Sequence, residues 1–195
     1  MTSTAAVLLL LLATRGGEDL DDADLARRIK NGDRAAFEAF FRRHHAALIR
    51  YLTRRHCPPD VADDIVQNAF VYIWQRRDAI NPDKSLRGYL FTIGYSRLLN
   101  HSRDTAKFDY AAAPDDHTAP AAPDAEAEHQ LLQEHLQAAI NQLPERRRAV
   151  FELCFMEDLT YREAAAVLDI TRKTVENHMR LALRDIRDAL AAFEP

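Results

Sequence analysis

The stretch that decides the fold is residues 160–187, TYREAAAVLDITRKTVENHMRLALRDIR. Thr160 and Glu163 have the spacing of an S/T-x-x-E capping box, which predicts a short helix of about eight residues. A turn at Asp169-Ile170 follows, and Thr171 is placed to cap a second, longer helix. Two helices joined by a turn of three to four residues are typical of a helix-turn-helix.

The second helix of this pair is amphipathic. Its buried face is predicted to hold Val175, Met179, Ala182, Leu183, Ile186 and Leu190. The opposite face carries Arg172, Lys173, Glu176, Asn177, Arg180 and Arg184. In a major groove Arg suits guanine, Asn suits adenine and Glu suits cytosine, so this face predicts DNA reading. The alternative is a solvated face held by ion pairs four residues apart.

Helical periodicity extends on both sides of a proline-rich gap. Before the helix-turn-helix, the apolar positions are Leu132, Leu136, Ala139, Ile140 and Leu143. Pro144 is placed to start a further helix with the inner face Val150, Phe151, Cys154 and Phe155. Four helices are predicted in residues 24–107. The first covers 24–31, and the second extends from its cap Asp33 to Cys57-Pro58-Pro59. The third covers 60–76 with Asp60 as its cap, and the fourth begins after Ser85.

We therefore predict an all-α protein of two small helical bundles joined by a flexible acidic linker. The predicted segments are an N-terminal extension (1–23), a first bundle (24–107), the linker (108–128) and a second bundle (129–192).

Charge is distributed unevenly along the 195 residues, whose formal net charge is −4. Residues 24–107 carry sixteen basic and nine acidic side chains, a net charge of +7, whereas residues 108–133 carry six acidic and no basic ones. The first bundle thus suits a nucleic-acid partner although the whole chain is acidic.

Other function classes find little support in the sequence. The apolar run at residues 5–13 is too short to span a bilayer, which needs about 20 residues, and a membrane tether is its alternative reading. The widely separated Cys57 and Cys154 suit a reducing cytoplasm, where we expect the protein. The adjacent carboxylates Asp63 and Asp64 diverge on a helix, so we expect no catalytic set. His44, His45, His56 and Cys57 belong to no repeat of spaced ligands, so we expect no metal site, and we expect no cofactor.

Two polar surfaces of the first bundle remain. The helix 60–76 has a polar face opposite its apolar stripe, made of Asp60, Asp64, Gln67, Asn68 and Gln75. Residues 84–107 interleave basic side chains with Tyr89, Phe91 and Tyr95. Basic and aromatic side chains together suit phosphates and unstacked bases, and a partly buried amphipathic helix is the alternative.

These segments resemble the sigma-70 family of bacterial transcription factors. Residues 63–70, DDIVQNAF, and Trp74 resemble region 2.2, residues 86–93, LRGYLFTI, are similar to regions 2.3 and 2.4, and residues 143–147, 159–165 and 174–178 resemble region 4. Two regions joined directly by a short linker are similar to the extracytoplasmic-function (ECF) type.

The resemblance implies functions for the polar surfaces. The polar face of helix 60–76 would bind the coiled coil of the largest subunit of core RNA polymerase. A loop and helix would capture the promoter −10 element through Asn81, Asp83, Lys84, Arg87, Arg97, Asn100 and Arg103. The second bundle would read the −35 element through Arg172, Lys173, Thr174, Glu176, Asn177, Arg180 and Arg184.

The resemblance also implies an anti-sigma factor as a further partner. Asp158 and Asp169 stand where glycine is frequent in the family, and we expect both turns to form because Asp tolerates the left-handed conformation. The sequence thus predicts a promoter-specificity subunit and no enzyme. The alternatives are a helix-turn-helix regulator that acts without polymerase, and an enzyme with a helical carboxylate or histidine site.

Overall fold

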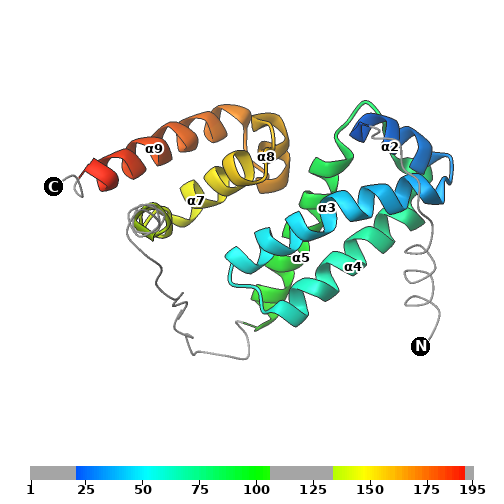
Figure 1. Ribbon diagram of the computed structural model, residues 1–195, viewed down its shortest axis with the longest axis horizontal. Coiled ribbons are helices and arrows are strands. Elements are labelled where there is room, and N and C mark those ends of the chain that lie inside the picture. The colour runs from blue at the N-terminus through cyan, green and yellow to red at the C-terminus, as the bar shows by residue number, and fades with distance from the viewer. Residues whose placement is uncertain (1–20, 106–133, 192–195) are drawn as a thin grey trace, which may run out of the picture. The chain divides into compact units, whose positions relative to one another are not determined.

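The protein is described by a computed structural model covering residues 21–105 and 134–191 (Figure 1). Every regular element in these two ranges is a helix, which confirms the all-α prediction. The chain divides into two compact units, one containing α2 to α5, the other containing α7, α9 and the first part of α8. The predicted linker, the apolar run at 5–13 and Leu132 lie outside the described residues. None of the described helices is long and apolar enough to cross a membrane.

Residues 21–105 form four α-helices and one 3₁₀ turn. They are α2 (Asp22–Lys30), α3 (Arg34–Arg54), α4 (Pro59–Gln75), the 3₁₀ turn η1 (Arg77–Ala79) and α5 (Leu86–Thr105). Helix α3 packs on both α2 and α4.

Local capping residues set most of these boundaries. The Asp33 carboxylate accepts hydrogen bonds from the amides of Ala35 and Ala36, and the Ser85 hydroxyl accepts from that of Gly88, so both predicted caps are confirmed. Helix α2 begins two residues earlier than predicted because Asp21 is its cap.

The predicted cap Asp60 is wrong. Helix α4 starts at Pro59, and no side chain caps it. Proline suits the first helical position because its fixed φ is helical and its missing amide would have no partner there, so the helix begins one residue before Asp60. The Asp60 carboxylate instead lies in the first turn, where its negative charge interacts favourably with the helix dipole.

The core of the first unit is aromatic. The ring of Phe70 meets those of Phe37 and Phe40 edge to face, with centroids 6.2 and 5.8 Å apart. Helix α5 approaches α3 closely at Gly94, where an added Cβ atom would lie 2.9 Å from Cδ1 of the fully buried Leu48.

The second unit begins with a helix over residues 134–141. It continues with α7 (Glu145–Phe151), the π-helical segment η2 (Glu152–Met156), α8 (Tyr161–Leu168) and α9 (Arg172–Ala191). Helices α7 and α9 pack on each other.

The π-helical segment changes which side chains face the core. The amide of Glu157 donates to the carbonyl of Glu152 five residues earlier, so this turn is wider than an α-turn. Leu153 is fully buried in place of the predicted Cys154, which is half-buried, and Phe155 is 65% exposed. The prediction that Phe155 lies on the inner face is therefore wrong.

Three other predicted core positions differ. Leu136 and Leu183 are exposed, and Leu190 is half-buried. The buried stripe of α9 is narrower than the apolar pattern: it consists of Val175, Met179, Ala182 and Ile186.

Candidate nucleic-acid and protein interfaces

The polar face of α4 is present as predicted. Asp60, Asp64, Gln67, Asn68 and Gln75 are all exposed, whereas Ile65, Val66, Ala69, Phe70 and Ile73 are buried. With about 100° per residue, these five polar positions occupy an arc of roughly 100° centred opposite the buried stripe. They form one continuous surface, which we call the α4 face.

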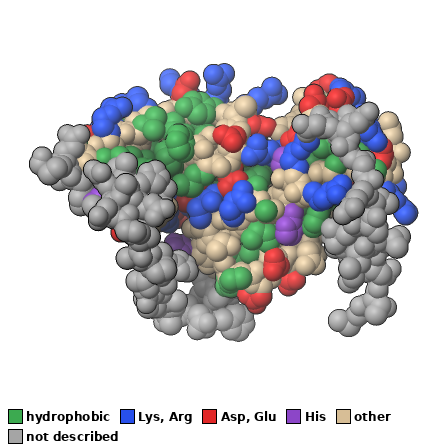
Figure 2. Space-filling model, viewed as in Figure 1, with side chains coloured by type: hydrophobic (Ala, Val, Ile, Leu, Met, Phe, Trp, Pro, Cys, Tyr) green, Lys and Arg blue, Asp and Glu red, His purple; other side chains and the backbone are tan. Residues whose placement is uncertain are grey.

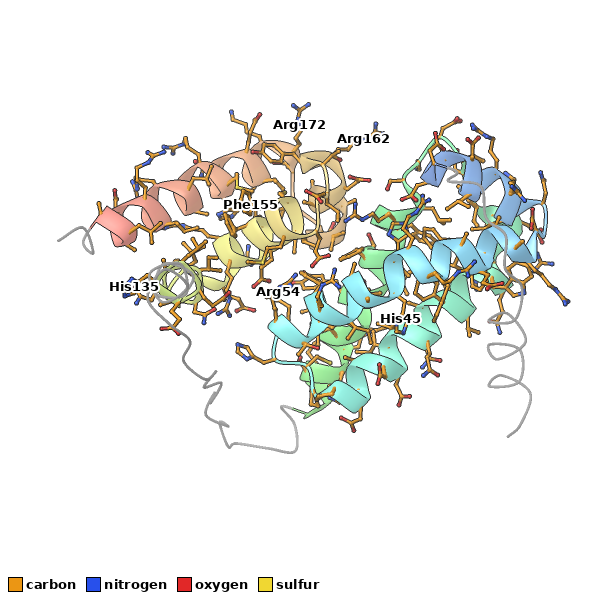
Figure 3. The ribbon with its side chains drawn as sticks, viewed as in Figure 1. His45, Arg54, His135, Phe155, Arg162 and Arg172 are labelled. Carbon is orange, nitrogen blue, oxygen red and sulfur yellow. The ribbon has the colours of Figure 1, made fainter. Side chains whose placement is uncertain are left out.

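The α4 face borders a histidine of α3. His45, labelled in Figure 3, is half-buried beside the ring of Phe41, with ring centroids 4.7 Å apart. Burial lowers the pKa of His45, and the negative charge of Asp63 opposes this shift. The effect of Asp63 on His45 depends on how α3 and α4 pack, so the sequence alone does not reveal it.

The loop between η1 and α5 is held by its own hydrogen bonds. The Asn81 side-chain oxygen accepts from the amide of Asp83 at 3.0 Å, and the Asn81 carbonyl accepts from the amide of Lys84. The Lys30 ammonium donates to the carbonyl of Ile80, tying the loop to α2. The structure thus brings Asn81, Asp83 and Lys84 together as exposed side chains of one ordered turn.

The predicted DNA residues of α5 divide between two sides of the helix. Asn100 and Arg103 are exposed, and the Arg103 guanidinium donates to the Asn100 side-chain oxygen at 2.6 Å. Arg87 is half-buried, and its guanidinium lies 5.9 Å from the ring of the buried Phe91. Arg97 is also half-buried. Arg87 and Arg103 point about 160° apart around the helix axis.

The aromatic residues interleaved along α5 divide in the same way. Phe91 is fully buried and Tyr95 is half-buried, with both rings near that of Tyr51. Tyr89, in contrast, is 42% exposed. For Phe91 the alternative of a partly buried amphipathic helix is therefore confirmed, whereas the ring of Tyr89 is accessible to solvent.

The helix-turn-helix forms through the predicted local contacts. The Glu163 carboxylate accepts from the amide of Thr160 at 2.7 Å, and the amide of Glu163 donates to the Thr160 hydroxyl, which completes the capping box. The Thr171 hydroxyl caps α9 by accepting from the amide of Thr174. Asp169 adopts the left-handed conformation, with φ of 52°, as does Asp158, with φ of 47°. Both turns form as expected.

The solvent face of α9 carries a basic stripe. Lys173, Asn177, Arg180 and Arg184 are exposed at a helical spacing that keeps them within an arc of about 60°. Figure 2 shows Lys and Arg side chains along the outer edge of this helix. Arg180 donates to the Asn177 side-chain oxygen at 3.1 Å, so these two predicted DNA residues are paired in the free protein.

The other predicted residues of α9 flank this stripe. Arg172 and Glu176 are exposed at its edge. Thr174 is half-buried, and its hydroxyl lies 2.8 Å from that of Thr171, so the structure places it in the cap of the helix.

Two further arginines of the second unit extend the basic surface. Arg162 of α8 is exposed, and Figure 3 shows it on the same side of the helix pair as Arg172. Arg187 lies on the side of α9 that carries Arg180 and Arg184. Sequence reasoning missed both, although the first helix of a helix-turn-helix often crosses the DNA backbone.

The basic stripe is connected to the core of the second unit. The Asp185 carboxylate accepts hydrogen bonds from Arg184 on the stripe and from Arg147 on α7. These two arginines hold the pKa of Asp185 below its usual value, with the bond from Arg184 as the largest cause. One carboxylate therefore positions an arginine of the basic stripe and links α7 to α9.

Metal and thiol chemistry find no support in the residues that the structure describes. Within 21–105 and 134–191, there is no group of three or more His, Cys, Asp and Glu side chains placed to hold a metal ion. Burial and the nearby Glu163 raise the pKa of the Cys154 thiol to about 11. Burial also raises the pKa of Cys57. Raised pKa values do not favour the thiolate form that a nucleophile needs.

Comparison with known families assigns the two units separately. A model described as "Sigma-70 region 2" matches residues 40–108, and one described as "Sigma-70, region 4" matches residues 133–186. The two matches follow each other along the chain in this order.

The alignments with similar proteins cover most of this chain and nearly the whole length of those proteins. The ECF RNA polymerase sigma factor RpoE of Cereibacter sphaeroides is 29% identical over 165 residues, which cover 82% of this chain and 88% of the relative. The RNA polymerase sigma factor CnrH of Cupriavidus metallidurans is 29% identical over 175 residues, covering 82% and 90%. A solved structure of CnrH in complex with the cytosolic domain of CnrY matches with a TM-score of 0.61 at 26% identity, covering 89% of this chain and 99% of that one.

Proposed function

Because the chain belongs to the sigma-70 family and is of the ECF type, we propose that it directs core RNA polymerase to a promoter with two separated elements and helps to open the duplex. The observation that carries this proposal is the pair of surfaces in one chain. An exposed polar face lies on the helix of region 2, and a basic stripe lies on the second helix of the helix-turn-helix.

The α4 face is the proposed polymerase-binding surface. It contributes two carboxylates, Asp60 and Asp64, and three amide side chains, with the half-buried Val71 as the apolar residue among them. Such a surface can stay in water before the partner arrives and then form hydrogen bonds and ion pairs with a basic or polar helix.

The exposed turn with Asn81, Asp83 and Lys84 is the proposed −10 contact, together with Asn100 and Arg103 of α5. Arg87 and Arg97 stay in the proposed set, but their half-buried positions favour support of the helix over direct contact with a base. A base that leaves the stack costs a few kcal/mol, which contacts in such a site must offset.

The basic stripe of α9 is the proposed −35 reader. Lys173, Asn177, Arg180 and Arg184 would lie in the major groove, with Arg172 and Glu176 beside them and Thr174 capping the helix. In this proposal DNA bases and phosphates replace the partners that Arg180 and Arg184 have in the free protein.

We further propose an inhibitory protein of the anti-sigma class as a partner, since the similar CnrH was solved in complex with the cytosolic domain of CnrY. The proposed role is that of a specificity subunit without chemistry of its own. Its place of action would be the cytoplasm, where core polymerase and promoters meet.

The test is run-off transcription with purified core RNA polymerase on a library of genomic fragments. The proposal expects discrete transcripts that require this chain and start downstream of a shared pair of sequence elements. A helix-turn-helix regulator acting alone would bind DNA fragments but would not co-elute with core polymerase in size-exclusion chromatography. Absence of both co-elution and specific transcripts would refute the proposed function.

A further inference from the structure

The C-terminal end of α2 lies against the segment that leads from η1 to α5 (Figure 1). The Lys30 ammonium donates a hydrogen bond to the carbonyl of Ile80 at 2.9 Å. Just beyond the helix, a Cβ atom added at Gly32 would lie 3.8 Å from Nε of Arg77 in η1. This end of α2 therefore touches the chain shortly before residues 81–84, which we call the −10 turn.

Side chains outside the −10 turn hold it at both ends. Its own hydrogen bonds, from the amides of Asp83 and Lys84 to Asn81, determine the shape of the turn. Such local bonds do not determine the direction in which the turn points. That direction depends on the Lys30 bond before the turn and on the Ser85 hydroxyl after it, which caps α5.

Helix α2 is itself a firm support for Lys30. Its apolar side is buried, with Ile29 fully enclosed. The Asp22 carboxylate accepts a hydrogen bond from the Arg43 guanidinium at 2.9 Å and lies 2.9 Å from Nε2 of the buried His44. Because α2 is bonded to α3 at its start and buried along its length, Lys30 extends from a fixed position.

A second basic side chain of α2 is close to the −10 turn. The pKa of Arg27 is raised chiefly by its hydrogen bond to Asp24, and the negative charge of Asp83 adds to this shift. Arg27 is exposed, so water and salt screen its attraction to Asp83. The contact that can orient the turn is therefore the direct bond from Lys30.

We propose that Lys30 is a positioning residue for the −10 contact: its ammonium holds the −10 turn in the orientation that binds DNA and does not itself contact the DNA. This inference rests on the proposed function and assigns a role to α2, which contributes no residue to the proposed polymerase or DNA sets. A hydrogen bond from a charged donor is stronger than one between neutral groups. A turn released at its first end samples other orientations, and its affinity for DNA falls with the fraction of molecules in the binding orientation.

The competing role for Lys30 is a direct contact with a DNA phosphate, because its side chain is exposed. The two roles differ in their salt dependence. Each phosphate contact with a single strand adds about 0.7 to the magnitude of the slope of log K against the logarithm of the salt concentration. Loss of a positioning residue lowers the affinity and leaves this slope unchanged.

The experiment uses holoenzyme assembled from core polymerase and the full chain, on a promoter recovered by run-off transcription. Fluorescence anisotropy measures binding to the single non-template strand of the −10 region and to the duplex −35 fragment, each at several salt concentrations. The variants are Lys30→Met, which keeps an unbranched side chain without the charge, and Lys30→Arg, which keeps a charged donor. Arg50→Met is the matched control, because it removes a positive charge from another exposed position of the first unit.

The proposal expects Lys30→Met to weaken binding to the single strand by about 3- to 10-fold, with the salt slope of the parent. Lys30→Arg should retain most of the affinity, since its guanidinium can also donate to the carbonyl of Ile80. Binding to the −35 duplex, co-elution with core polymerase and the midpoint of chemical denaturation should stay unchanged in both variants. Arg50→Met should match the parent in every measurement.

Four results would overturn this inference. Unchanged single-strand binding by Lys30→Met would remove the positioning role. A salt slope reduced by about 0.7 in Lys30→Met would assign Lys30 to a direct phosphate contact. Equal losses in Lys30→Met and Lys30→Arg would show that a charged donor is not what holds the turn. A lower denaturation midpoint with a parallel loss of co-elution would reduce the role of Lys30 to general stability. Failure of the proposed function itself would appear differently, as a parent holoenzyme that recognises no promoter.

Discussion

Replacing Asp169, at the left-handed position between α8 and α9, by alanine should loosen the helix-turn-helix. A φ of 52° costs most L-residues roughly 1–2 kcal/mol, and Asp and Asn adopt it more readily than others. The turn has little room to relax, because the amide of Ile170 donates to the carbonyl of Ala165 at 3.0 Å and so fixes the end of α8. We expect Asp169→Ala to lose about 1 kcal/mol of stability in this helix pair.

Two other substitutions at this position separate backbone strain from charge. Asp169→Asn should be at least as stable as the parent, because Asn tolerates the left-handed region and removes a negative charge from the C-terminal end of α8. Asp169→Gly removes the strain and makes the unfolded chain more flexible, so the two effects partly cancel.

Amide hydrogen exchange of the full chain, read by mass spectrometry, measures these differences locally. A loss of 1 kcal/mol should raise exchange in peptides from 161–191 by about fivefold in Asp169→Ala. Peptides from 59–75 in the first unit serve as an internal reference and should not change. Equal protection in the alanine and asparagine variants would refute the claim that the left-handed turn determines the stability of the pair.

Four other substitutions test the interfaces and the packing. Asp64→Arg should abolish co-elution with core polymerase without unfolding, because it reverses a charge at the centre of the α4 face. Asn177→Ala should change −35 preference by about 1–3 kcal/mol at one base pair, read from binding to a panel of −35 variants. Gly94→Ala should lose about 1–3 kcal/mol in chemical denaturation, since the new Cβ atom meets the buried Leu48 side chain. The pKa of Asp33 is lowered chiefly by its hydrogen bond from Arg28, with smaller effects of the Ala36 and Ala35 amides. The ionised Asp33 carboxylate therefore contributes to stability above about pH 4, and this contribution is lost as the pH falls through the lowered pKa. Asp33→Asn should flatten this pH dependence.

Each of these predictions has a contradicting outcome, and two of them have a control variant. Asp78→Arg changes an equally exposed carboxylate outside the α4 face and should leave co-elution intact. If Asp64→Arg still co-elutes, α4 is not the polymerase-binding surface. Ser96→Ala, on the solvent side of α5, should not change stability, and equal stability of Gly94→Ala would contradict the close approach of α5 to α3. A −35 profile identical to the parent would remove Asn177 from the base contacts, and an unchanged acid transition in Asp33→Asn would remove that carboxylate from the pH dependence.

Much of the fold could be predicted because local chemistry specifies it. Caps such as Asp33, Ser85 and the Thr160–Glu163 box form hydrogen bonds within three residues, so their partners are visible in the sequence. The buried stripe of α4 and the exposed stripe of α9 follow from a constant 100° per residue, and both predictions are confirmed.

The remaining errors have non-local or competing causes. Proline favours the first position of a helix, and Asp favours the cap position before it. Because Pro59 takes the first position of α4, Asp60 lies inside the helix and cannot be its cap. The π-turn at 152–156 breaks the constant angle, so Phe155 leaves the core. The half-buried position of Arg87 beside the ring of Phe91 also depends on helix packing, and its DNA contact stays a prediction. The interaction of Tyr89 with Tyr72 depends on how α4 and α5 meet, which no local pattern contains.

The carboxylate shared by Arg147 and Arg184 has a consequence for the energetics of the proposed DNA contact. In the free protein Asp185 acts as an internal anion that keeps the Arg184 side chain ordered and partly neutralised. In the proposed complex, a DNA phosphate that binds Arg184 replaces the Asp185 carboxylate as its partner, so one anion is exchanged for another. The net gain in binding free energy from this contact is therefore small. The Asp185 carboxylate stays beside Arg184 and competes with the phosphate for it, so this contact is weaker than one made by an arginine without an internal partner.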